Sequence, residues 1–263
     1  MEVAYYKKLF QTIGNIIELI EKDDIPKYLL FLENAFPYMD NYNYHKGMNG
    51  IIQELTGLLK TKNIGTDSDR ALLLDFQATL ETKPEKAIKL EKDALAQIEN
   101  ITADNARLVS NLHANLGGLY RMNGHPDLAR EHMEKSISLL DQFNLLHIND
   151  SIPQIANYAM FLTEQQEPER GISELQKLSG IIKEYHSDDC LDYAKVQETL
   201  GTIYLMTANL PQAKTHFKRA FKIYEKIWAD EPEMIEAKYQ EIQELYPQIG
   251  FSIGKTLSGL LTK

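Results

Sequence analysis

Residues 111–129 read NLHANLGGLYRMNGHPDLA, which predicts a helix, a tight turn at Asn123-Gly124 and the beginning of a second helix. The same pattern returns at a fixed interval of 42 residues. The first-helix positions that recur are Leu116, Gly117 and Tyr120, then Tyr158, Ala159 and Leu162, then Leu200, Gly201 and Tyr204. A constant period of this length is typical of a solenoid in which each unit is one helical hairpin.

Small residues mark the place where the two helices of each hairpin cross. On the first helix these residues are Gly117, Ala159 and Gly201; on the second helix they are Ala87, Ala129, Gly171 and Ala213. A glycine inside a helix costs roughly 1 kcal/mol relative to alanine, so a recurring small residue indicates close packing. A third small position, at Ala94, Ser136 and Ala220, is expected to face the following hairpin, and Leu178 interrupts it.

The hydrophobic periodicity predicts an all-α chain, with no alternating strand pattern. We expect a right-handed α-solenoid of stacked antiparallel helix pairs, with about thirteen helices. Proline is expected to open the second helix at Pro84, Pro126 and Pro168, with Pro211 one residue past the next equivalent position. The expected helices include 3–22, 26–38, 44–60, 84–100 and a closing helix at 251–261.

The chain is predicted to be a single domain over residues 1–263, because neither a linker nor a low-complexity tract interrupts it. Its expected parts are an N-terminal capping helix at 1–24, a degenerate repeat at 25–62, repeats at 67–101, 104–145, 149–186 and 188–228, and a C-terminal capping repeat at 230–263. Capping elements cover the apolar faces that a stack of repeats leaves at its ends.

Composition limits the classes of partner. The net charge of −10 argues against a nucleic-acid surface, which would need a basic face. No apolar run is long enough for membrane insertion, and the N-terminus lacks the pattern of a secretion signal. A single cysteine excludes an internal disulfide and favours a reducing compartment, so we expect a cytoplasmic location.

The repeat resembles the tetratricopeptide repeat (TPR). The residues that carry the resemblance are Leu116, Gly117, Tyr120, Ala129, Leu200, Gly201, Tyr204, Ala213, Phe217 and Ala220. The usual period of that repeat is about 34 residues, so helices of a 42-residue repeat gain about one turn each. Long repeats with an asparagine ahead of Leu-Gly look most like those of kinesin light chain and related bacterial proteins.

The resemblance implies that the first helix of each pair lines a concave, peptide-binding face. Counted from the packing residues, the expected peptide-binding positions are Asn111, Asn115, Arg121, Asn157, Met160, Lys195, Thr199 and Thr202. Asn115 and Asn157 lie 42 residues apart, and carboxamides both donate to and accept from a peptide backbone. Two alternatives stay open: the asparagines are ordinary surface residues, and Met160 fills the core instead of contacting a peptide.

Signals for catalysis or for a metal are weak. The sequence has no phosphate loop, nucleophile elbow or paired-histidine metal helix, so we expect no enzyme activity, no metal and no cofactor. Residues 186–190, His-Ser-Asp-Asp-Cys, gather three metal-ligand types, but capping by an aspartate at the helix that follows explains them. The remaining histidines, among them His113, His132 and His216, show no shared face in the sequence.

Two functions are favoured by these observations over a third, an enzyme or enzyme-regulating subunit, for which the sequence shows no catalytic motif. The first is a non-catalytic scaffold or adaptor that binds a peptide or helix of a partner protein in the concave groove. The second is a peptide-sensing regulator of the type found among bacterial signalling-peptide receptors, which usually carry an N-terminal effector domain where this sequence shows only a short helix. The final helix is expected either to cap the array or to pair with a second chain as a homodimer.

Overall fold

The structure is a computed structural model that describes Leu29, Leu32 and residues 45–62, 64–148, 151–245 and 247. Regular secondary structure in these residues is entirely helical, which confirms the all-α prediction. The helices are α3 (His45–Lys62), α4 (Asp67–Leu80), α5 (Pro84–Leu95), α6 (Ala106–Met122), α7 (Pro126–Gln142), α8 (Ser151–Glu164), α9 (Pro168–Tyr185), α10 (Leu191–Met206), α11 (Leu210–Ile227) and α12 (Pro232–Leu245).

Ten helices therefore account for the described residues, fewer than the thirteen expected for the whole chain. The helices expected at 3–22 and 251–261 lie outside the described residues, as do the termini on which the capping and homodimer predictions rest. Of the helix expected at 26–38, Leu29 and Leu32 are described; both are helical and are buried in the cluster formed with α3 and α4.

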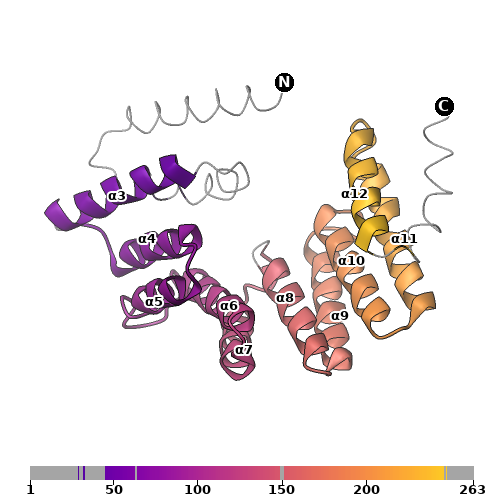
Figure 1. The fold of residues 1–263 in the computed structure, drawn as a ribbon, viewed down its shortest axis with the longest axis horizontal. Coiled ribbons are helices and arrows are strands. Elements are labelled where there is room, and N and C mark those ends of the chain that lie inside the picture. The colour runs from indigo at the N-terminus through magenta and orange to yellow at the C-terminus, as the bar shows by residue number, and fades with distance from the viewer. Residues whose placement is uncertain are drawn as a thin grey trace. The chain divides into compact units, whose positions relative to one another are not determined.

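The chain divides into two compact units, residues 1–132 and 133–263. In the first unit, α4 packs against α3, α5 and α6, and α5 also packs against α6. In the second unit, α8 packs against α9, α9 against α10, α10 against α11, and α11 against α12, while α8 also contacts α10 (Figure 1). Each unit thus consists of neighbouring antiparallel helices. The prediction of one continuous domain stays a prediction.

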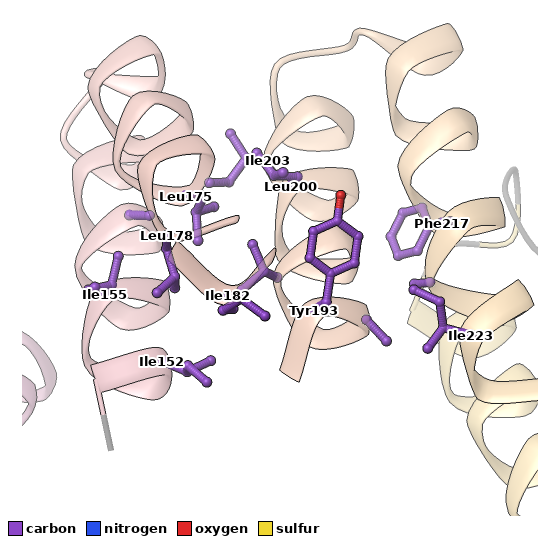
Figure 2. Packing of buried hydrophobic residues seen from close by; sticks show 14 of the residues in the cluster. Ile152, Ile155, Leu175, Leu178, Ile182, Tyr193, Leu200, Ile203, Phe217 and Ile223 are labelled. Atoms are coloured by element: carbon purple, nitrogen blue, oxygen red, sulfur yellow. The ribbon is translucent and has the colours of Figure 1, made fainter. Parts of the chain in front are cut away.

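Figure 2 shows why the helices of the second unit stay together. Apolar side chains from four consecutive helices meet in one buried cluster; those labelled include Ile152, Ile155, Leu175, Leu178, Ile182, Tyr193, Leu200, Ile203, Phe217 and Ile223. No single hairpin encloses these side chains, so stacking of neighbouring hairpins is what removes them from water.

The small residues lie at the close helix crossings, as the sequence predicts. Ala87, Ala129, Ala159 and Ala213 are buried, and so are the third-position residues Ala94, Ser136 and Ala220. A Cβ added to Gly171 would lie 2.6 Å from the backbone oxygen of Ala159, so this crossing brings α9 directly onto the backbone of α8. A Cβ on Gly201 would lie 2.9 Å from the Phe217 ring.

The prolines begin their helices as predicted. Pro84, Pro126 and Pro168 are the first residues of α5, α7 and α9, and Pro211 is the second residue of α11. The predicted end of α5 at residue 100 is wrong. After Ala96, backbone hydrogen bonds run to the third preceding residue, from Gln97 N to Ala94 O and from Ile98 N to Leu95 O, both at 3.1 Å. The chain tightens here, and α5 ends at Leu95.

The turn between the helices of a hairpin has the same backbone geometry in three repeats. Gly124, Gln166 and Ala208, spaced 42 residues apart, have φ of 75°, 66° and 59°. In each turn the next residue donates a backbone hydrogen bond to the carbonyl five residues before it; the three are His125 to Tyr120 at 2.9 Å, Glu167 to Leu162 at 2.8 Å and Asn209 to Tyr204 at 2.7 Å. Only the first of these turns has the glycine that this conformation favours.

Replacing Gln166 by glycine is expected to raise the free energy of unfolding by about 0.5–1 kcal/mol, because glycine adopts a positive φ without the steric cost of a Cβ. Urea denaturation followed by circular dichroism measures this change. Gln176, exposed in the middle of α9, is the control: glycine there should lower the free energy by about 1 kcal/mol. Equal effects at the two sites would contradict the interpretation.

Candidate functional site

The second unit places four of the predicted peptide-binding residues on two helices in contact. Asn157 projects from α8, and Lys195, Thr199 and Thr202 project from α10, which packs beside α8. Asn157 and Lys195 are exposed, while the two threonines are half-buried. The 42-residue register puts Asn157 at the same repeat position as Thr199. These residues form the α8–α10 face.

The polar groups of the α8–α10 face differ in their availability. Thr199 Oγ1 donates to Lys195 O at 3.0 Å, and Thr202 Oγ1 donates to Glu198 O at 3.1 Å, so both hydroxyl donors are used within α10. Lys195 Nζ lies 3.7 Å from Asp192 Oδ1. The side chain of Asn157, in contrast, makes no hydrogen bond to another described residue. Its carboxamide is therefore open to a ligand, as is the exposed ammonium group of Lys195.

Met160 is half-buried and packs against the hydrophobic cluster of the second unit. Much of its thioether side chain therefore contributes to the core. This placement supports the core-filling alternative for Met160, and leaves only part of the side chain accessible from the α8–α10 face.

The three predicted residues of the first unit all lie on α6. Asn111 and Arg121 are half-buried, and each has interactions within the protein. Asn115 is exposed, and its Nδ2 donates to Asp75 Oδ1 of α4 at 2.8 Å. The two asparagines of the predicted pair are therefore in different environments: Asn115 binds a neighbouring carboxylate, and Asn157 does not.

A concave feature beside Lys195 was not identified from the sequence. A pocket of about 280 Å³ opens between α10, α11 and α12, with Lys195 on its rim. Its wall includes the stacked rings of Tyr224 and Trp228, whose centroids are 4.7 Å apart, and the exposed Met234. Aromatic and thioether surfaces of this kind suit an apolar side chain of a partner.

A hydrogen-bonded network includes two of the residues that line this pocket, Tyr224 and Lys238. Tyr224 Oη donates to Glu198 Oε2 at 2.6 Å, and Lys238 Nζ lies 2.8 Å from Glu198 Oε1. Burial and the adjacent Glu198 charge raise the pKa of Tyr224, which keeps its proton. Burial alone would lower the pKa of Lys238, but its hydrogen bonds and charge interactions with Glu198 and Glu241 outweigh burial and raise it. The network therefore joins α10, α11 and α12 by a hydrogen bond and an ion pair to Glu198.

The segment 186–190 has structural contacts for its potential metal ligands. Asp189 pairs with Lys226, Asp188 lies 3.9 Å from Lys183, and the His186 ring nitrogen Nε2 lies 2.9 Å from His147 O. The predicted aspartate cap is wrong: Cys190 is the N-cap of α10, and its Sγ accepts from Tyr193 N at 3.4 Å. The extended backbone of Cys190 turns the sulfur toward this amide. Within the described ranges, no three His, Cys, Asp or Glu side chains are grouped as a metal site.

Two of the histidines that show no shared face in the sequence meet between neighbouring helices, whereas His216 contacts Gln197. His113 of α6 and His132 of α7 have their Nδ1 atoms 2.8 Å apart, and the Tyr120 ring stacks on His132 with centroids 5.5 Å apart. The position 84 residues after His113 is Gln197, whose Oε1 lies 2.9 Å from Nδ1 of His216. The His113–His132 and Gln197–His216 contacts thus occupy equivalent positions, 84 residues apart, between the first and second helix of a repeat. Both contacts are consistent with a role in helix packing.

Comparison with protein families supplies the deciding observation. Residues 151–226, which include α8 to α11 almost entirely, match the family model described as tetratricopeptide repeat. Residues 151–226 therefore form tetratricopeptide repeats. The TPR match falls on the hairpins with the clearest small-residue crossings, at Gly171 and Gly201. No curated protein matches the chain.

Solved structures show the same fold at low sequence identity. BtubC (BKLC) from P. vanneervenii has a TM-score of 0.57 and 16% identity over 90% of this chain and 92% of its own. A putative kinesin light chain of Podosopora anserina with nearly identical TPR-like repeats has a TM-score of 0.56 and 15% identity over 75% of this chain and 96% of its own. The chain therefore shares the helical-solenoid fold of these proteins. No helix in the described part of it is long and apolar enough to cross a bilayer.

Proposed function

We propose that this chain is a non-catalytic scaffold that binds an extended peptide or a helix of a partner protein along the first helices of its repeats. TPR folds serve generally as protein-interaction scaffolds, which supports the broad class. The observation that carries the finer proposal is Asn157, an exposed carboxamide with no hydrogen bond to another described residue, in the same repeat position as Thr199. A free carboxamide on this helix face can pair with both polar groups of a peptide unit.

Besides Asn157, the second unit has two features that suit a peptide. Lys195 offers a cation at the rim of the pocket between α10, α11 and α12, and the Tyr224 and Trp228 rings offer an apolar wall. Together with Asn157 they provide a backbone contact, a charge contact and a side-chain pocket on one unit. A cytoplasmic location and a partner other than nucleic acid are part of this proposal.

The test is binding of an immobilised library of extended peptides to the full chain. Asn157→Ala is expected to weaken binding by about three- to tenfold, since a peptide hydrogen bond contributes about 0.5–1.5 kcal/mol. Gln176→Ala on α9 is the matched control, because it removes an exposed carboxamide from a second helix. Equal affinity of wild type and Asn157→Ala would contradict the docking role of the α8–α10 face.

The same measurement separates the scaffold from the peptide-sensing regulator. Tight binding of short free peptides, with a change in the radius of gyration by small-angle scattering, would favour the regulator. Binding that requires a long segment of a folded partner, with an unchanged radius of gyration, would favour the scaffold.

A further inference from the structure

The first unit departs from the repeat pattern at both members of one packing pair. The first-helix member is Asp75, at the place of Gly117, Ala159 and Gly201; the second-helix member is Glu91, at the place of Met133, Leu175 and Phe217. In the second unit this pair is a small residue facing a buried apolar one: a Cβ on Gly201 would meet the Phe217 ring at 2.9 Å. In the first unit two carboxyl groups take their place.

The two carboxyl groups of this pair differ in burial: Glu91 is buried, and Asp75 is half-buried. Glu91 of α5 is only 1% exposed and shares a hydrogen bond with Asp75 of α4, while its second oxygen, Oε2, has no hydrogen-bond partner. Asp75 is half-buried and accepts from Asn115 Nδ2 of α6 at 2.8 Å. Asn115 is exposed, so the Asp75 end of the pair is partly accessible to solvent and the Glu91 end is not.

The charge of the pair follows from its burial. Burial, and next the charge of Asp75, raise the pKa of Glu91 far above its usual value, so Glu91 holds a proton near neutral pH. The groups that act on Glu91 are Asp75 from α4 and Asn115 from α6; Lys92 of α5 lies over the Tyr120 ring of α6, 5.5 Å from its centroid. One negative charge therefore remains, on the half-buried Asp75 that is hydrogen-bonded to Asn115.

We propose that Asp75, positioned by Glu91 and Asn115, is a subsite for a basic side chain, a lysine or an arginine, of a peptide docked on α4 and α6 of the first unit. The proposal rests on the proposed docking function and adds the chemistry of one contact. The ligand cation donates to Asp75, and the exposed carboxamide oxygen of Asn115 is a second acceptor. A positive charge at Asp75 also favours loss of the Glu91 proton to solvent, so affinity increases as pH rises.

The hydrogen bonds to Asp75 favour binding of a cation. A carboxylate held by donors on both sides has one orientation before the ligand arrives, and less conformational freedom is lost on binding. Charge-assisted hydrogen bonds are stronger than neutral ones, which gives a basic residue an advantage over an amide of similar size.

The experiment uses two pools of extended peptides that are identical except for a central lysine or a central glutamine, with uncharged residues elsewhere. The full-length chain is expected to bind the lysine pool about tenfold more tightly than the glutamine pool at pH 8. Asp75→Asn should abolish this preference, and Glu91→Gln should abolish its increase between pH 6 and pH 9. Glu85→Gln, which removes an exposed carboxylate from the same helix, should change neither.

Each outcome decides the proposal. If both pools bind with equal affinity, the cation subsite is refuted and peptide docking stands. If neither pool binds, the subsite and the docking function both fail. Asp75→Gly, which restores the residue of the equivalent position 117, is the second variant, and circular dichroism checks that both variants are folded. A lysine preference that survives in both variants refutes the role of Asp75.

Discussion

Replacing Gly171 by alanine is expected to lower the free energy of unfolding of the second unit by about 1–3 kcal/mol. The new Cβ would lie 2.6 Å from Ala159 O and 3.3 Å from Ala159 C and Cα, all backbone atoms of α8. Backbone cannot move aside as a flexible side chain can, so α8 and α9 must separate and the cluster around Leu175 and Leu178 must loosen. Urea denaturation of the two proteins measures the change.

Gly180 provides a control within the same helix. It is exposed, and a Cβ added there would meet no atom within 4 Å, so alanine should raise the free energy of unfolding by about 0.5–1 kcal/mol through helix propensity alone. Opposite signs at Gly171 and Gly180 would show that the crossing, and not glycine itself, sets the effect. A stabilising Gly171→Ala would mean that the helices are farther apart than described.

Replacing Glu91 by glutamine is expected to stabilise the first unit above neutral pH by about 1–3 kcal/mol. Burial, and next the charge of Asp75, raise the pKa of Glu91 to about 10 in the folded chain. Glutamine keeps a donor for Asp75 without a proton that can be lost. The free energy of unfolding of wild type and variant, measured by urea denaturation from pH 4 to pH 10, checks this expectation.

The sign of the pH dependence is fixed by the direction of the shift. Below the unfolded pKa of 4.5, both states of Glu91 are protonated and the folded pair loses nothing. As pH rises from there toward the folded value, the unfolded chain ionises and the folded chain does not, so wild-type stability falls. Glu91→Gln should remove that fall, and the exposed Glu85→Gln should leave it in place. A wild-type stability that is flat between pH 5 and pH 9 would refute the protonated pair.

The periodic features of the fold were predictable because each depends on one helix and its immediate partner. Pro84, Pro126 and Pro168 begin helices since a missing N–H has no cost there, and a proline needs no distant contact to do so. Gly171 marks a close crossing since only a small residue fits at that step of the repeat. A proline or a glycine at an equivalent position of another repeat therefore has the same structural role.

The contacts of individual polar side chains were not predictable in the same way. That Asp75 replaces a small residue is visible in the sequence, but the burial of Glu91 against it depends on the spacing of α4 and α5. Likewise, the separation of 2.8 Å between His113 and His132 depends on rotamers, and the sulfur cap of Cys190 depends on the backbone of a single loop residue. The 42-residue period gives no information on side-chain rotamers or on the backbone conformation of a loop residue.

The candidate site was predictable in part. The register placed Asn157 and Lys195 on neighbouring helices, where the structure exposes both. It could not indicate that Asn115 binds Asp75, or that Thr199 and Thr202 donate to their own helix. The pocket beside Lys195 needs α10, α11 and α12 together, and no single repeat unit contains it.

The backbone contact at Gly171 has a mechanical consequence. The backbones of α8 and α9 are in contact at this crossing, so the two helices cannot move closer together. They therefore behave as one rigid hairpin. Neighbouring hairpins contact one another through aliphatic and aromatic side chains, such as Ile182 of α9 and Tyr193 of α10. Side chains of this kind can slide over one another. When the second unit bends, we therefore expect the movement to occur at the interfaces between hairpins and not within them.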